Sequence, residues 1–195
     1  TLPRPAGTAR GTAATASGDA SLAFLRIPAV WMCFAFFFFY AGALSIVQSF
    51  APESARILHA VPAQLAAICL TVYMVCAAAG MVLGGFLASD ALRCERIVGM
   101  AFGLAAAFAL LIGFADVPGW TVPLLFGAMG FASGTAGPSR DLLVKASAPA
   151  NATGRVYGVV YAGLDIGQAV MPLLIGSLMD RQAYRGVWLA LALLQ

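Results

Sequence analysis

A single carboxylate stands in an apolar run near the end of the sequence. Asp165 lies in the segment YAGLDIGQAVMPLL, with Tyr161 four positions before it and Gln168 three positions after it. Side chains three and four positions apart share one face of an α-helix, so these polar groups would form one stripe. An isolated aspartate at mid-bilayer costs about 2.5–3.5 kcal/mol on insertion scales, and water or neighbouring helices lower that cost. The stripe indicates either a cavity that handles a solute or a proton, or an interhelical hydrogen bond that only fixes packing.

The composition of the chain indicates a membrane protein. Of its 195 residues, 62% are hydrophobic and 10% are charged, whereas a soluble domain has about 45–50% apolar and about 25% charged residues. The formal net charge of +3 is small, and no basic run with interleaved aromatic residues occurs, so no nucleic-acid partner is expected. Residues 1–26 are rich in small and polar residues and are predicted to be a flexible cytoplasmic linker.

Five runs with little or no charge follow the linker, each close to the roughly 20 residues that a helix needs to cross a bilayer. They span residues 27–50, 62–89, 97–115, 117–139 and 156–179, and a shorter sixth run spans 187–195. Backbone groups cannot stay unpaired in lipid, so each run is predicted to be α-helical. The predicted fold is an all-α, polytopic membrane helical bundle over residues 27–195, with five complete transmembrane helices and a truncated sixth.

The positions of Lys and Arg predict the orientation of these helices. If the linker is cytoplasmic, eight of the eleven Lys and Arg residues lie inside and three lie outside, which agrees with the positive-inside rule. The turn at residues 90–96 and the loop at 140–155 then face the cytoplasm, and the loop at 53–59 faces the outside. Cys94, in the first of these, is expected to serve as a labelling probe of this orientation.

Residue types that could support catalysis or metal binding are sparse. The P-loop pattern is absent, so no ATP site is expected. The four cysteines form no CxxC pair and the chain has one histidine, so neither a metal site nor a cofactor is expected. An intramembrane aspartyl protease needs two facing acids, and only Asp165 lies deep in a run. A serine type needs a base near Ser133, whereas His59 falls in an outer loop, so the protein is not expected to be an enzyme.

Polar residues in other runs could line the same path as the stripe. Tyr40 and Gln48 are eight positions apart in the first run, Thr71 lies in the second run and Ser133 in the fourth. The predicted pathway for a substrate or protons is lined by Asp165, Tyr161, Gln168, Tyr40, Gln48, Thr71 and Ser133.

Charged residues gather at the predicted cytoplasmic ends of the runs. The second run ends in GMVLGGFLASDALRCERIVG, and the fourth ends in GTAGPSRDLLVKASAPANATGRVYG, where Gly137 and Pro138 predict a break in the helix. These charges either anchor the loops on the cytoplasmic side or form a gate, pairing across helices in one state and separating in another. The gate candidates are Asp90, Arg93, Arg96, Arg140, Asp141 and Arg155.

The glycine, acid and arginine pattern after the second run resembles a motif of the major facilitator superfamily. The segments GPSRDLLV and ATGRVYGVVYAGLDIGQAVMPLLIGSLMD are similar to bacterial members near the fosmidomycin-resistance type of drug exporter. The resemblance covers nearly the whole chain and implies the C-terminal half of a 12-helix transporter. It also implies inverted three-helix repeats around a central site, with the N-terminal half missing from this chain.

This resemblance implies secondary active transport of a small organic solute by alternating access, and proton-coupled efflux is the expected mode. The expected partners are the solute, protons, the lipid bilayer and the N-terminal half of the same chain, in the bacterial cytoplasmic (inner) membrane. The alternative is a non-transporting polytopic membrane protein, such as an assembly factor or a receptor.

Overall fold

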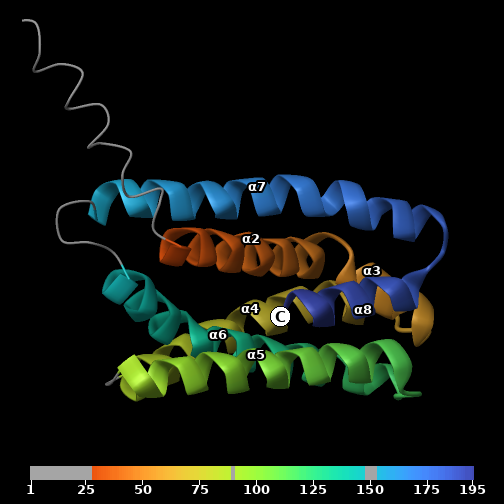
Figure 1. Cartoon of the computed structure of the whole chain (residues 1–195). Coiled ribbons are helices and arrows are strands. Elements are labelled where there is room, and N and C mark those ends of the chain that lie inside the picture. Colours follow the sequence, from red (N-terminus) through yellow and green to blue (C-terminus); the bar gives the residue numbers. More distant parts are fainter. Residues whose placement is uncertain (1–27, 89–90, 148–152) are drawn as a thin grey trace, which may run out of the picture.

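The computed structural model describes residues 28–88, 91–147 and 153–195, so the predicted linker lies outside the described residues. These ranges form helices and no strand, which confirms the predicted all-α class. In chain order the elements are α2 (Pro28–Ser49), α3 (Ala51–Leu58), α4 (Ala63–Leu87), α5 (Ala91–Phe114), the 3-10 turn η2 (Gly119–Thr121), α6 (Val122–Ser147), α7 (Thr153–Asp180) and α8 (Tyr184–Leu194). The long helices run alternately in opposite directions along the bundle, as a polytopic chain requires (Figure 1).

Long apolar helices match four of the five predicted complete membrane spans. In the described part of the chain, four segments are long and apolar enough to cross a membrane: Val30–Ser49, Ala63–Leu87, Arg93–Phe114 and Tyr157–Asp180. Helix α6 is less apolar but has 26 residues and packs along α4 and α5. A helix of that length spans about 39 Å, so α6 is long enough to be the remaining full crossing of the bundle. Helix α8 is shorter, with 11 residues.

Two boundaries predicted at the charged ends of the runs were wrong. Helix α5 begins at Ala91, so Arg93 and Arg96 lie in its first turns and not in a connecting turn. Leu, Arg and Glu are good helix formers, which explains why the charged segment extends the apolar helix. Helix α6 continues through Pro138 to Ser147, so the predicted break does not occur. Membrane helices tolerate proline because neighbouring groups compensate for the hydrogen bond that it removes.

The prediction that residues 53–59 form a loop is also wrong, because most of this segment forms the short helix α3. Its Glu53 lies in the first turn and Arg56 in the last turn, positions that favour these charges at helix ends. The two side chains form an ion pair of 2.6 Å, and the hydrogen bond from Arg56 holds the pKa of Glu53 below its usual range. Helix α3 is tied to its neighbours by the Ser54 hydroxyl, which donates to the carbonyl of Tyr184 at 3.2 Å.

Small residues bring two pairs of helices into backbone contact. At each of six glycines, an added Cβ atom would overlap the backbone of the facing helix. Small residues four positions apart allow this close approach of helices in a membrane. It joins α4 to α6 and α2 to α7. The glycines are Gly80 and Gly84 of α4, Gly130 and Gly134 of α6, and Gly163 and Gly167 of α7.

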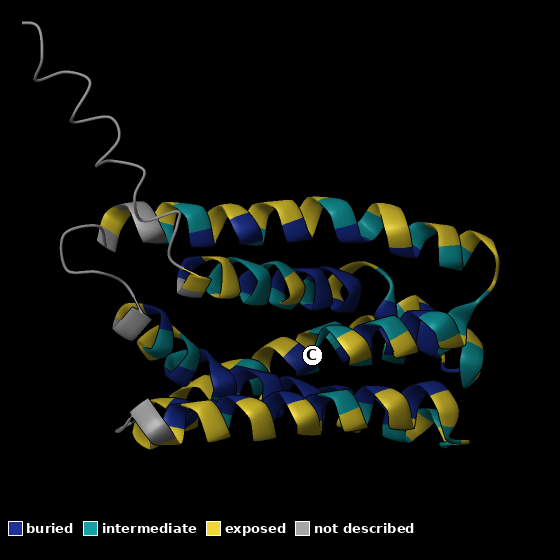
Figure 2. Ribbon diagram, viewed as in Figure 1, coloured by how far each residue is buried: buried dark blue, intermediate teal, exposed yellow. Residues whose placement is uncertain are grey.

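The helices form two groups that α3 and α8 join at one end. Helices α2 and α7 lie side by side, and α4, α5 and α6 form the second group (Figure 1). The largest buried cluster lies at the end where α3 and α8 pack, and includes Trp188, Phe126 and Ile112. Buried residues face inward, whereas the outer faces of α4, α5 and α7 are exposed (Figure 2). In a membrane these outer faces contact lipid or another protein element.

Candidate functional site

The polar stripe of the fifth predicted run lies on the exposed face of α7. Tyr161 is 52% exposed, and Asp165 and Gln168 are exposed as well. The opposite face of α7 packs against α2, where Gly163 and Gly167 make the close contact. The stripe therefore lies mostly away from α2, toward the space outside this bundle, although the Tyr161 ring still reaches Phe37 of α2. The buried positions of α7 include Val160, Gly163, Gly167, Met171 and Ile175.

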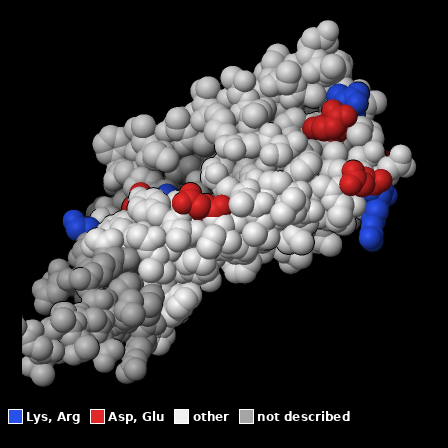
Figure 3. Space-filling model, turned by 90° about the horizontal axis from the view of Figure 1, so that it is seen from above, with Lys and Arg blue, Asp and Glu red and all other residues white. Residues whose placement is uncertain are grey.

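Asp165 lies deep in the membrane span of α7, about 12 Å along the helix axis from Tyr157 and about 22 Å from Asp180. Among the described residues, the ion pairs are Glu53–Arg56 and Arg140–Asp141, and neither involves Asp165. Neither α2 nor the span of α7 contains Lys, Arg or His. On the side of the molecule that carries α7, charged groups are few and most lie toward the two ends (Figure 3). Exposure of this carboxylate to lipid is unfavourable, so its face of α7 needs water or protein against it.

Two tyrosine rings precede Asp165 on α7. Tyr157 and Tyr161 stack with their centroids 6.0 Å apart and their planes at 25°. The Tyr161 ring also meets the ring of Phe37 on α2 edge-on, at 6.2 Å. Behind the stripe, the Ser45 hydroxyl of α2 donates to the backbone carbonyl of Gln168 at 3.4 Å. The sequence reasoning missed Tyr157, although its position four residues before Tyr161 places it on the same face.

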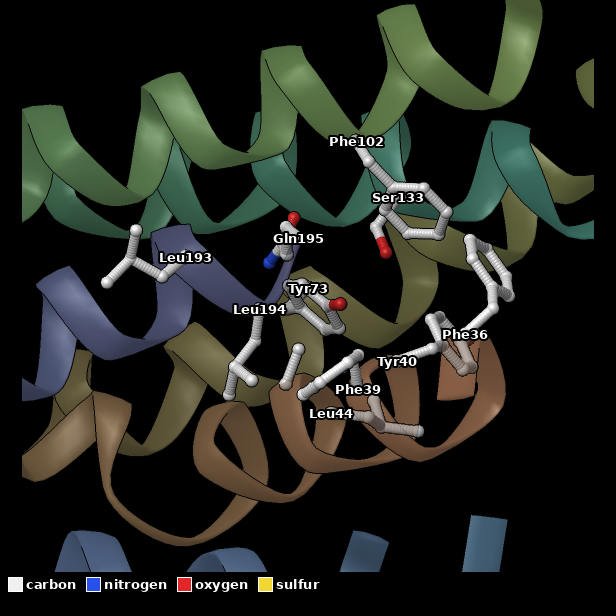
Figure 4. Close-up of a pocket in the computed structure, with 11 residues that line it drawn as sticks. Phe36, Phe39, Tyr40, Leu44, Tyr73, Phe102, Ser133, Leu193, Leu194 and Gln195 are labelled. Carbon is white, nitrogen blue, oxygen red and sulfur yellow. The ribbon is translucent and has the colours of Figure 1, made fainter. Parts of the chain in front are cut away.

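Tyr40 and Ser133, which were predicted to share a pathway with Asp165, lie elsewhere. They line a cavity of about 270 Å³ between α2, α4, α5, α6 and the end of α8 (Figure 4). Tyr73 of α4 also lines this cavity and its hydroxyl interacts with that of Ser133. Phe102 of α5 packs edge-on against Tyr40, with 5.9 Å between the ring centroids. The cavity thus combines hydroxyl groups with aromatic walls, and sequence reasoning did not identify Tyr73 as part of it.

The two remaining pathway candidates lie neither on the polar stripe of α7 nor around the cavity. Gln48 is exposed in the last turn of α2, and Thr71 is exposed on α4. The structure therefore brings three of the seven candidates together on α7 and two together around the cavity. It does not assemble all seven into one path within the described residues.

Comparison with known proteins identifies a family for this arrangement of alternating long helices with a polar stripe on one of them. The sequence model of the family described as Major Facilitator Superfamily matches residues 31–194, from α2 to α8. The chain belongs to the Major Facilitator Superfamily. It is therefore an integral, multi-pass membrane protein of a family that moves small solutes across lipid bilayers and is generally not enzymatic. A search of curated proteins and a search of solved structures each found no match.

The gate candidates of this superfamily member differ in their surroundings. Arg93 and Arg96 are exposed on α5, whereas Cys94 between them is fully buried. The prediction that Cys94 would serve as a labelling probe is therefore wrong, because a reagent in water cannot reach it. Asp90 and the side chain of Arg155 lie outside the described residues.

Among the described gate candidates, Arg140 makes both an ion pair and contacts with aromatic rings. Its Nε donates to the carboxylate of the adjacent Asp141 at 3.0 Å, and its side chain is only 13% exposed. Its guanidinium carbon lies 4.8 Å from the ring centre of Phe37 and 4.5 Å from that of Tyr40. Arg140 also borders a groove of about 540 Å³ between α2, α5 and α6, where Glu95 is a second charged lining residue. In this state Arg140 thus joins α6 to α2 through aromatic contacts.

Proposed function

We propose that this chain is the C-terminal half of a proton-coupled exporter of small organic solutes, in the bacterial cytoplasmic membrane. The observation that carries the proposal is the exposed carboxylate of Asp165 in the middle of α7, which has Tyr161 and Gln168 exposed beside it. A membrane helix presents such a stripe to a cavity or a partner helix, because lipid would penalise the charge. The resemblance of two segments to the fosmidomycin-resistance type of drug exporter supports a drug as the solute.

The other wall of the cavity would come from an N-terminal half of the same protein. Transporters of this kind bind substrate near the midplane between two repeats and rock one against the other. The exposed face of α7 fits such an interface, because it is polar at its centre, at Asp165 and Gln168, and apolar farther out, at Leu173 and Leu174. In this arrangement residues 1–26 would form the cytoplasmic linker between the halves.

Asp165 can couple a proton gradient to this motion. A carboxylate holds a proton more tightly where water is excluded than where it is wetted. If the stripe is closed in one state and open in the other, the two states differ in proton affinity at Asp165. A ligand shifts a conformational equilibrium only by its differential affinity for the two states. Protons entering from one side would then drive the transporter toward the state that holds them.

The test uses the protein as its gene encodes it, purified and placed in vesicles that contain a pH-sensitive dye. A panel of drug-like solutes is added, and solute-dependent proton movement is recorded. We expect Asp165→Asn to fold and insert but to lose this proton movement. Asp180→Asn makes the same chemical change at the end of the same helix and should retain it. Normal solute-coupled proton movement by Asp165→Asn would leave Asp165 as a residue that only fixes packing.

A further inference from the structure

The cavity that Tyr40 and Ser133 line lies inside the bundle, apart from the stripe on α7. It has a volume of about 270 Å³, and helices α2, α4, α5, α6 and α8 line it, whereas none of the described α7 side chains does (Figure 4). An engineered cavity of about 150 Å³ with apolar walls is large enough to bind benzene. The cavity of this bundle therefore has room for a molecule of about two fused rings.

Buried hydroxyl groups form one part of the cavity wall. Tyr73 of α4 and Ser133 of α6 are only 3% and 6% exposed, and their hydroxyls form a hydrogen bond with each other. That bond uses one of the two O–H groups, so the pair retains one donor and free acceptor positions. The amide oxygen of Gln195 is also buried at this cavity and accepts no hydrogen bond from the described residues. Buried polar groups need hydrogen-bond partners, so this wall favours an occupant that both donates and accepts.

Aromatic rings form another part of the wall. Phe102 of α5 meets Phe36 and Tyr40 of α2 edge-on, with ring centroids 5.7 Å and 5.9 Å apart. Such edge-on contacts between rings are favourable beyond the apolar area that they bury. Ala43 and Leu44 of α2 add apolar surface beside these rings. An aromatic occupant would extend this pattern of ring contacts.

The described residues that line the cavity include no charged side chain. Arg140 packs against the Tyr40 ring, with its guanidinium carbon 4.5 Å from the ring centre, but it is not one of the lining residues. An ionised group is costly to move out of water unless a partner of opposite charge receives it. The cavity therefore favours a neutral occupant over a charged one.

We infer that this cavity binds neutral phenols with about two fused rings. A phenol hydroxyl both donates and accepts, and it lies at the wall formed by Tyr73 and Ser133. The ring system lies against Phe102 and Phe36, where further edge-on contacts are available. This binding site is separate from the polar stripe of α7, so it does not depend on the proton role proposed for Asp165.

The experiment compares three bicyclic probes of similar shape, using the protein as its gene encodes it in nanodiscs and empty nanodiscs as the blank. The probe 2-naphthol has a hydroxyl, naphthalene has no polar group, and 2-naphthoate is charged. We expect saturable binding of 2-naphthol and no binding of 2-naphthoate. Naphthalene should bind about three- to tenfold more weakly than 2-naphthol, because it cannot form the hydrogen bond.

Variants of the wall test where the phenol hydroxyl binds. Ser133→Ala combined with Tyr73→Phe should weaken 2-naphthol binding by about three- to tenfold and leave naphthalene binding unchanged. Ala43→Met places a flexible side chain in the cavity and should weaken the binding of both probes. Thr135→Ala is the matched control and should bind like the wild type. It removes a hydroxyl of the same helix that donates to the carbonyl of Phe131 at 2.8 Å and does not line the cavity.

Thermal unfolding without probe checks that each variant folds. Saturating 2-naphthol should raise the unfolding midpoint of the wild type, because a ligand that binds only the folded state stabilises it. Equal affinities for 2-naphthol and naphthalene would overturn the inference, and so would unchanged 2-naphthol binding by the combined variant. If the wild type binds none of the three probes, the cavity holds only water and the inference is refuted. Each of these results leaves the proton movement attributed to Asp165 to its own test.

Discussion

The guanidinium of Arg140 lies against two aromatic rings of α2, although it belongs to α6. A cation over an aromatic face contributes about 0.5–2 kcal/mol, and more when water is excluded. Here the side chain is nearly buried and contacts both Phe37 and Tyr40. Contacts between α2 and α6 are otherwise few. At this end of the bundle, Arg140 therefore helps hold the α2–α7 pair to the other helices.

Removing the charge at Arg140 should destabilise the protein through this contact. We expect Arg140→Gln to lower the free energy of unfolding by about 1–2 kcal/mol, measured by denaturant unfolding in detergent. Combining it with Phe37→Leu should cost less than the sum of the two single changes, because both remove the same interaction. Arg93→Gln, at an exposed position of α5, is the control and should change stability little. Strictly additive losses would show that Arg140 acts without the aromatic contact.

At the scale of the helices, the close approach of α4 and α6 gives a direct prediction about glycine. A Cβ atom at Gly134 would overlap the backbone of Ala77, which cannot move without shifting the whole helix. We expect Gly134→Ala to cost about 1–3 kcal/mol of unfolding free energy, as overpacking typically does. Gly103 of α5 has nothing within 4 Å of the same added atom, so Gly103→Ala should stabilise by up to about 1 kcal/mol. Equal effects of the two variants would show that the helices do not meet at Gly134.

The helices themselves could be predicted from the sequence, because an apolar run in lipid has one favourable backbone structure. The residues at which these helices begin and end could not be predicted in this way. The proline inside α6 has a local preference typical of a turn, but the helix continues through it. The residues that begin α5 are good helix formers, and their charge concealed this in a search for apolar runs. Helix α3 was missed because its eight residues include few large apolar side chains and look like a polar connection.

Helix faces were predicted more reliably than the pairing of helices. The spacing of Tyr161, Asp165 and Gln168 is enough to place them together, since it depends only on helix geometry. Whether Tyr40 and Ser133 join them depends on how α2 and α6 are rotated about their axes. The Gly163–α2 contact and the packing of Tyr40 against Phe102 set that rotation, and they are contacts between segments distant in the sequence. The sequence alone contains no comparable local signal.

At the scale of the whole molecule, the alternation of helices places all inner connections at one end and all outer connections at the other. The end of α4, the start of α5, the end of α6 and the start of α7 lie at the same end of the bundle, and α3 lies at the opposite end (Figure 1). One measurement at each end therefore fixes the orientation of every helix. Cys94 cannot report it because it is buried, but Arg93 beside it and Ile57 of α3 are both exposed.

We expect the α4–α5 end to face the cytoplasm, because this orientation keeps most Lys and Arg residues inside. The test replaces Cys33, Cys69, Cys76 and Cys94 by Ala and introduces Arg93→Cys or Ile57→Cys. An impermeant maleimide should label Ile57→Cys in intact cells, and should label Arg93→Cys only after the membrane is opened. The reverse pattern would contradict the positive-inside assignment. It would also turn the Tyr157–Tyr161 end of the stripe toward the outside of the cell, so that Asp165 would be reached from the outside along that end.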